Sequence, residues 1–242
     1  MRAGSAEAGS EATDLLLSVA EQLKIPLSTI ARQAELGRMT GTVCLDDVAA
    51  IRVQADAALT LVESYLLGLE LLREQTSLLL EPVSVSSMLA DIAHDLYRYA
   101  RQYGVELELH IAGKYEPVMA HPRGLRAVLL SLGYTLIEAR AAQEGDKRRP
   151  VLTLASHRSA HGIIAGLYGE YSDLHAAQWH RALELCGRAR QPFAALSAGS
   201  AAGLFVADTI LQAMDTRLRV GRYLKQSGLG MTLSPSQQLS FV

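Results

Sequence analysis

The feature that most constrains the fold is a heptad pattern in residues 46–80. Apolar residues repeat there over roughly four heptads, which indicates a long helix with a coiled-coil-like seam. One row consists of Val48, Ala55, Val62 and Leu69, a second of Ile51, Ala58, Tyr65 and Leu72, and Leu59 and Leu66 widen the stripe. Asp46 or Asp47 can cap the start of this helix.

A second amphipathic helix precedes it, in residues 13–38. Its apolar residues recur at spacings of three and four, as they do on one face of a helix; they are Leu15, Leu16, Val19, Leu23, Leu27, Ile30, Ala31 and Ala34. Gly37 and Gly41 then interrupt the pattern and indicate a turn. The two segments therefore predict an antiparallel helical hairpin over residues 13–80.

The width of the apolar stripes predicts a partner for this hairpin. Two antiparallel helices have too little interior to bury both stripes. We expect two copies of the chain to pair their hairpins into a dimeric four-helix bundle. The alternative is that residues 81–242 cover the hairpin within the same chain.

The remainder of the chain alternates between patterns of strand and helix. A short strand leads into a helix of about residues 86–103, and "VELELHIAG" alternates like a half-buried strand. The later elements are a helix of about 122–143, adjacent strands in "PVLTLASHR" and "GIIAGLYG", a helix in 173–190, a helix after a Gly-rich start near 197, and a final hairpin. This order predicts an α+β chain in which the helical hairpin precedes an α/β sandwich, with helices on one face of a mixed sheet.

Composition limits the class of protein. The chain has 242 residues and a formal net charge of −2, which argues against a general attraction to nucleic acids or membranes. Cys44 and Cys186 lie far apart in the sequence, so neither a disulfide framework nor a metal site is predicted. No apolar run reaches the ~18 residues of a membrane span, and we expect a cytoplasmic protein. Residues 1–12 are small and polar, which predicts a disordered tail.

Several short stretches stand out within this framework. "SVAEQLKIPLSTI" places Pro26 inside a helical pattern, where proline removes a hydrogen bond and kinks the axis. "VMAHPRGLRAVLLSLGYTLIEA" begins a helix after His121 and Pro122. "QPFAALSAGSAAGLFVADTILQAM" changes from a Gly-rich stretch into a helix, and "SGLGMTLSPS" closes the chain with a Gly-rich strand.

These stretches, in this order after a helical hairpin, resemble the transmitter core of bacterial sensor histidine kinases. The resemblance covers about residues 14–235. It implies a dimerisation and phosphotransfer hairpin followed by a GHKL-type ATP-binding domain. The hairpin stretch is similar to the family's phospho-acceptor box through Leu23, Lys24, Pro26 and Leu27; the Gly-rich stretch is similar to its F and G2 boxes through Pro192, Phe193, Gly199, Gly203 and Leu204.

The chain departs from the family pattern at the phosphotransfer position. Glu21 occupies the place of the phospho-accepting histidine, and a carboxylate does not replace an imidazole as a phosphoryl carrier. Gln22 occupies the place of the acidic residue that assists, and an amide takes up no proton at neutral pH. The resemblance implies that Pro26 shapes a face of the helix on which a receiver domain docks.

The chain also departs from the pattern in the nucleotide-binding boxes. Ser131 and Thr135 occupy the places of two asparagines, one of which helps to hold Mg²⁺. Gly169 has no aspartate before it to bind adenine. The Gly199–Gly203 stretch contains two alanines whose methyl groups would crowd a phosphate.

We therefore predict a non-catalytic, histidine-kinase-like signalling protein that dimerises, binds a receiver domain or a histidine kinase, and regulates phosphate flow. The predicted docking residues are Glu21, Gln22, Lys24, Ile25 and Pro26; the predicted degenerate nucleotide pocket consists of Ser131, Thr135, Gly169, Gly199 and Gly203. No catalytic residue, metal or cofactor is assigned, and weak binding of ATP with Mg²⁺ stays open. Two alternatives remain: a divergent phosphotransferase or ATP-binding kinase, and a scaffold that binds another small ligand in the old pocket.

Overall fold

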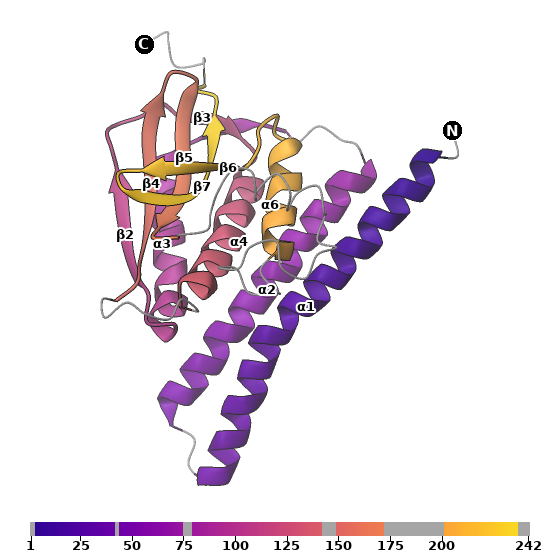
Figure 1. The fold of residues 1–242 in the computed structure, drawn as a ribbon, viewed down its shortest axis with the longest axis vertical. Helices are drawn as coiled ribbons and strands as arrows, with labels where there is room; N and C mark the ends of the chain where they lie inside the picture. Colours follow the sequence, from indigo (N-terminus) through magenta and orange to yellow (C-terminus); the bar gives the residue numbers. More distant parts are fainter. Residues whose placement is uncertain (1–2, 42–43, 75–78, 142–148, 172–200, 237–242) are drawn as a thin grey trace.

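A helical hairpin and an α/β domain make up the computed structural model, which describes residues 3–41, 44–74, 79–141, 149–171 and 201–236 (Figure 1). The hairpin consists of α1 (Ala3–Thr40) and α2 (Leu45–Glu74). Helix α1 begins at Ala3, so residues 3–12 are helical where a disordered tail was predicted. Four of these ten residues are alanine, the strongest helix former, and lengthening an existing helix adds one hydrogen bond per residue, which offsets the cost of Gly4 and Gly9.

The α/β domain follows the predicted order of strands and helices. Its helices are α3 (Val85–Gln102), α4 (Pro122–Ala141) and α6 (Ala201–Gln212). Its strands are β1 (Glu81–Val83), β2 (Glu106–Ile111), β3 (Val118–Ala120), β4 (Val151–Ser159), β5 (Gly162–Gly169), β6 (Arg219–Tyr223) and β7 (Gln226–Leu233). The helix predicted in residues 173–190 lies outside the described residues.

The main sheet has five strands in the order β2-β4-β5-β7-β6. The β2–β4 pair is parallel and the other three pairs are antiparallel, so the sheet is mixed, as predicted. Helices α3 and α4 pack on one face, and α6 packs on α4. Fully buried leucine and isoleucine side chains fill the space between these layers: Leu89, Ile92, Leu96, Leu125, Leu129, Leu132, Leu136, Leu152 and Leu154.

Local sequence accounts for the helix ends. The hydroxyl of Ser84 accepts a hydrogen bond from the N–H of Ser87 (3.3 Å) and caps α3. After α3, Gly104 adopts a φ of 68°, a left-handed conformation that glycine adopts without strain. His121 caps α4, because its Nδ1 accepts the N–H of Gly124 at 3.0 Å. The imidazole of His121 thus acts as the N-cap of α4.

The β6–β7 hairpin curls over the face of the sheet that lies opposite the helices (Figure 1). Tyr223 ends the edge strand β6, yet its ring stacks on His157 of β4, with ring centroids 5.3 Å apart. Its ring also lies 6.1 Å from that of His110, on β2 at the opposite edge of the sheet. The sheet is therefore strongly curved.

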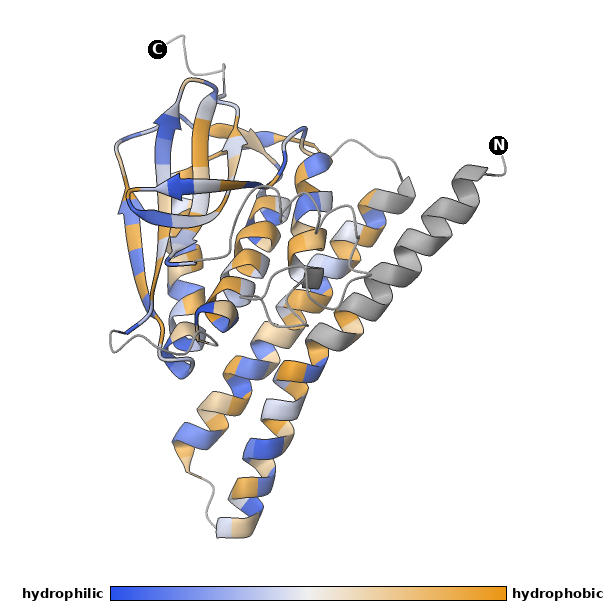
Figure 2. Ribbon diagram, in the orientation of Figure 1, coloured by the Kyte–Doolittle hydropathy of each residue, from blue (hydrophilic) through white to orange (hydrophobic). Residues whose placement is uncertain are grey.

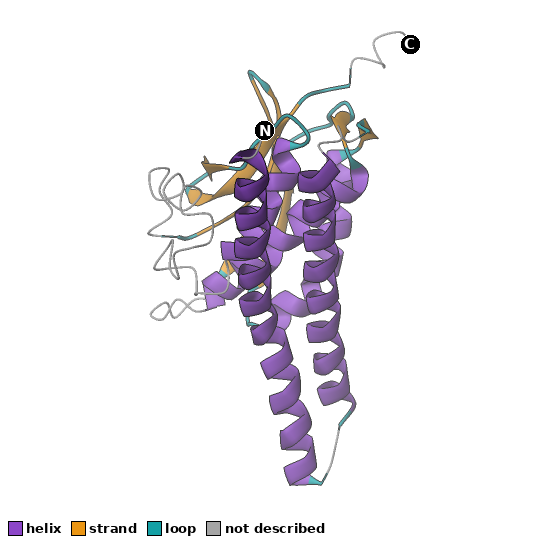
Figure 3. Cartoon of the chain, turned by 90° about the vertical axis from the view of Figure 1, so that its right-hand side faces the viewer, coloured by secondary structure: helices purple, strands orange, loops and turns teal. Residues whose placement is uncertain are grey.

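The hairpin packs against the α/β domain of its own chain. Helix α2 contacts α4 and α6, and α1 contacts α6. Ala57 and Tyr65 belong to the same apolar core as the domain, and the side chain of Gln54 donates to that of Gln102 at 2.8 Å. Figure 3 shows α1 and α2 side by side in front of the domain. Residues of the α/β domain therefore cover one side of the hairpin within the same chain, as the alternative prediction had it.

Other apolar residues of the hairpin stay exposed in the single chain. They include Leu27, Leu36, Val48, Leu59 and Leu66, each more than half exposed. Figure 2 shows apolar segments along the part of the hairpin that extends away from the sheet. No helix in the described part of the chain is long and apolar enough to cross a membrane.

Candidate functional site

The predicted docking residues lie in one stretch of α1. Lys24 is exposed, Ile25 is half-buried and Pro26 is buried. Glu21 and Gln22 lie in the same helix. The helix continues on both sides of Pro26, and the hydroxyl of Thr29 donates to the carbonyl of Ile25 at 2.9 Å. The outward side of this stretch therefore presents Lys24, with Leu27 (55% exposed) one turn further on.

Two residues of the predicted pocket lie one turn apart on α4. Ser131 and Thr135 are fully buried, and neither hydroxyl has a hydrogen-bond partner among the described residues. Their spacing puts them on the same side of α4 as Gly124, where an added methyl group would meet Ile210 of α6. A buried hydroxyl without a partner is costly. This side of α4 therefore carries two buried hydroxyl groups that lack a hydrogen-bond partner among the described residues.

Gly169, the third pocket residue, lies against an aromatic ring. A methyl group on Gly169 would lie 2.9 Å from Cε2 of Tyr171 and 3.2 Å from the carbonyl oxygen of Val151. Tyr171 is itself buried, and its hydroxyl donates to the carbonyl of Leu136 at 2.9 Å. Burial raises the pKa of Tyr171 above its usual range. Tyr171 thus connects the end of β5 to the middle of α4 and occupies the space beside Gly169.

The Gly-rich stretch is described only in part. Gly203 is buried in the first turn of α6, followed by the buried Leu204. Gly199 lies outside the described residues. The structure therefore brings Ser131, Thr135 and Gly203 to the facing helices α4 and α6, with Gly169 at the end of β5.

Two charged residues near this region were not singled out from the sequence. Glu138 is buried on α4 and accepts a hydrogen bond of 2.5 Å from the hydroxyl of Tyr99. Burial raises the pKa of Glu138 to about 7, although the hydrogen bond from Tyr99 acts in the opposite direction. Arg140, whose side chain is 7% exposed, pairs with Glu170 at 3.3 Å. The signal in the sequence was a glutamate and an arginine within an apolar helical run.

The described residues of this region do not provide the carboxylate ligands of an ATP–Mg²⁺ site. Mg²⁺ is bound through carboxylates and substrate phosphates, with water completing the shell. Ser131 and Thr135 offer neutral hydroxyls, Glu138 is engaged by Tyr99, and Glu170 is exposed beside Arg140. The ring of Tyr171 occupies one side of Gly169.

Comparison with known proteins defines the class of fold. No protein-family model matches the chain. No curated protein sequence matches it either. Among solved structures, the Acinetobacter baumannii histidine kinase AdeS is 17% identical with a TM-score of 0.52, over 89% of this chain and 98% of AdeS.

Two further kinase structures match along nearly the whole chain. Histidine kinase ThkA, in complex with response regulator protein TrrA, is 12% identical with a TM-score of 0.57, over 94% of this chain and 63% of that one. Full-length ShkA in complex with AMPPNP is 13% identical with a TM-score of 0.54, over 95% of this chain and 46% of that one. The chain therefore has the fold of a histidine kinase core, which confirms the fold that the resemblance implied.

Proposed function

We propose that this protein is a dimeric, non-catalytic signalling protein that binds a receiver domain or a histidine kinase and regulates phosphate flow. The observation that carries the proposal is the position of Tyr171. Its ring lies against Gly169, which the family resemblance assigns to the adenine-binding box, and its hydroxyl donates to the carbonyl of Leu136 on α4. Glu21 at the phosphotransfer position supports the same conclusion.

ATP with Mg²⁺ should bind weakly or not at all. Each lost hydrogen bond to a charged group costs ~1.5–3 kcal/mol, so two or three losses are enough to remove micromolar affinity. Calorimetry with MgATP tests this, with Tyr171→Phe as a matched variant that keeps the ring and removes only the hydroxyl. A dissociation constant in the low micromolar range for the wild type would favour the enzyme alternative.

The protein should also not phosphorylate itself. Incubation with labelled ATP should leave the wild type and Glu21→His unlabelled, because phosphoryl transfer depends on positioned nucleotide and metal as well as on the acceptor. An acid-labile, base-stable phosphoryl group on the wild type would contradict the proposal, and His94 would be the first acceptor to examine.

Dimerisation is proposed through the exposed side of the hairpin. Leu59 and Leu66 are 61% and 51% exposed and lie seven residues apart on α2. Burying a fully exposed leucine is worth ~1.5–3 kcal/mol, so partly exposed pairs across two copies add up to a stable contact. The double variant Leu59→Asp/Leu66→Asp should lose the hairpin contact, seen as a smaller species in sedimentation, and stay folded, because neither side chain is needed in the core of the single chain.

Leu224→Asp is the control for this variant, since Leu224 is 76% exposed at the distant β6–β7 turn. It should leave the dimer unchanged. A wild-type protein that sediments as a monomer at micromolar concentration would refute the dimer.

The partner is proposed to dock on α1 around Lys24. Support comes from the ThkA structure, in which a kinase of this fold is in complex with a response regulator protein. Lys24→Glu should weaken binding to receiver domains of the same organism, measured by interferometry, because rim charges steer association. Lys225→Glu, on the β6–β7 turn, is the control. Equal binding by both variants would place the docking surface elsewhere.

A second function is favoured by Ser131 and Thr135. Two buried hydroxyls without partners suit a small polar ligand held between α4 and α6. Native mass spectrometry of the purified chain should then show a bound small molecule that is lost in Ser131→Ala/Thr135→Val. If the ligand-free chain is the only species, and the variant is as stable as the wild type, the scaffold function is excluded.

A further inference from the structure

Strand β2 leaves one edge of the main sheet unpaired. The N–H of Glu106 donates to the carbonyl of Pro150 (2.8 Å), and the N–H of Ala112 donates to that of Ser156 (3.0 Å). Alternate residues of a strand face the same neighbour, so the backbone groups of Leu107, Leu109 and Ile111 point away from β4. Within the described residues, β2 pairs only with β4, and Figure 1 shows it at the margin of the sheet.

This edge lacks several of the devices that block pairing with another chain, although it carries two glutamates. Residues 106–111 contain no proline, glycine or lysine. Their register with β4 runs without a bulge from Glu106 to Ile111. Leu109 and Ile111 are 39% and 36% exposed, although both lie on the helix side of the sheet. An unpaired edge with exposed apolar side chains is a template for another strand.

We propose that β2 pairs with β2 of a second copy of this chain, antiparallel about a two-fold axis at Leu109, so that the two sheets become continuous. On the helix side, Leu109 then meets the partner's Leu109, and Leu107 meets the partner's Ile111. On the other face, Glu108 meets the partner's His110, and this pair occurs twice. The outward backbone groups of the odd-numbered residues pair with one another in this register.

Charge selects this register over its neighbours. Side chains that face each other across the two strands must lie on the same face of the sheet. The two-fold axis can therefore pass only through a residue, and the neighbouring registers place it at Glu108 or His110. An axis at Glu108 would set two glutamates opposite each other, and an axis at His110 would set two histidines opposite each other. Within one chain, Glu108 and His110 are about half exposed, with Oε2 and Nε2 3.6 Å apart, so both remain available for the partner. The other neighbours of these two side chains are Thr153 and Tyr223.

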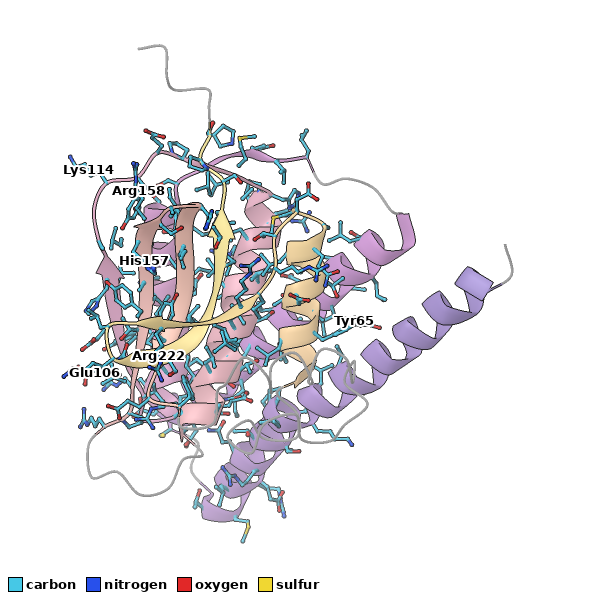
Figure 4. The ribbon with its side chains drawn as sticks, turned by 45° about the horizontal axis from the view of Figure 1, so that its top comes forward. Tyr65, Glu106, Lys114, His157, Arg158 and Arg222 are labelled. Carbon is cyan, nitrogen blue, oxygen red and sulfur yellow. The ribbon has the colours of Figure 1, made fainter. Side chains whose placement is uncertain are left out.

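The surroundings of β2 have room for the second copy. A cavity of about 550 Å³ beside the start of β2, lined in part by Tyr97, Arg101 and Arg149, lies where the partner's chain would leave the paired strand. Figure 4 shows Glu106 and Lys114 near opposite ends of β2. Antiparallel pairing therefore brings each Glu106 to the end of the strand nearest the partner's Lys114.

This contact is separate from the hairpin contact. Figure 1 shows β2 at the edge of the sheet that lies away from α1 and α2. Two different two-fold contacts on one chain link dimers into longer arrays. We therefore expect the mass of the assembly to rise beyond that of the hairpin dimer as protein concentration increases.

Residue-resolved hydrogen exchange at increasing protein concentration tests the pairing directly. The amides of Leu107, Leu109 and Ile111 should exchange more slowly as concentration rises, by about twofold once half of the chains are paired and by about tenfold once nine-tenths are paired. The amides of Glu106, Glu108 and His110 are bonded to β4 in the single chain and should change little. Exchange of the odd-numbered amides that is independent of concentration overturns the proposal.

A charge exchange tests the register. Glu108→His and His110→Glu should each weaken the contact about tenfold in sedimentation equilibrium, since each sets like or neutral groups opposite each other. The double variant Glu108→His/His110→Glu restores a carboxylate opposite an imidazole and should recover wild-type association. Leu109→Lys should abolish the contact, and Leu224→Lys at the distant turn should not affect it. A double variant as weak as the single ones overturns the register and the proposal.

Discussion

Glu138 makes the stability of this protein depend on pH. The residue is only 8% exposed, one carboxyl oxygen accepts the hydroxyl of Tyr99, and the other has no hydrogen-bond partner in the described part of the chain. An ionised carboxylate is poorly stabilised in such a place. Burial accordingly raises the pKa of Glu138 from its ordinary 4.5 to about 7.

The sign of the effect follows from the direction of this shift. Because the pKa is higher in the folded than in the unfolded chain, the folded state binds the proton more tightly between pH 4.5 and about 7. The stabilisation that protonated Glu138 contributes to the folded state is therefore fully present below about pH 4.5 and is lost as pH rises through about 7. A shift of about 2.5 pKa units corresponds to about 3 kcal/mol, so this group lowers the free energy of unfolding by about that amount at pH 8.

Glu138→Gln removes the ionisation and keeps an oxygen that accepts from Tyr99. The variant should match the wild type at about pH 5 and exceed its free energy of unfolding by about 2–3 kcal/mol at about pH 8. Urea unfolding at both pH values measures this, and Glu170→Gln is the control because that carboxylate is 71% exposed. If wild type and Glu138→Gln lose stability equally between the two pH values, the burial argument is refuted.

Urea unfolding also tests three further positions. His121→Ala should cost ~1 kcal/mol through loss of the α4 cap, and His121→Asp should cost less. Gly133→Ala should cost ~1–3 kcal/mol, because its methyl group would overlap Leu96 of α3, and Leu96→Ala in the same chain should relieve that overlap. Gly104→Ala should cost about 1 kcal/mol, since its φ of 68° disfavours alanine. An unchanged unfolding midpoint in any of these variants would contradict the contact on which its prediction rests.

Local patterns were enough to predict the elements of this fold. Spacings of three, four and seven mark α1 and α2, and the alternation in "VELELHIAG" marks β2, because these periods follow from the geometry of one helix or one strand. The same holds for Gly104 after α3 and for the helix that starts after His121. The start of α1 at Ala3 was missed, because the composition of residues 1–12 suited a polar tail as well as a helix.

Long-range contacts decided the candidate site. No local pattern distinguishes Tyr171 from the other tyrosines, yet the chain returns it to α4, where it lies against Gly169. The sequence alone suggests that Glu138 is a solvated helix residue, whereas in the folded chain α3 places Tyr99 against it.

The same division between local pattern and tertiary structure applies to the two proposed contact surfaces, the exposed side of the hairpin and the edge of β2. The sequence determined that α2 is apolar on a wide stripe, and the packing of α4 and α6 decided that Tyr65 is buried while Leu59 and Leu66 remain exposed. The sequence determined that β2 is a strand, and the strand order decided that one of its edges is free. Periodicity depends on neighbours a few residues apart, whereas burial and pairing depend on residues that meet only after the whole chain has folded.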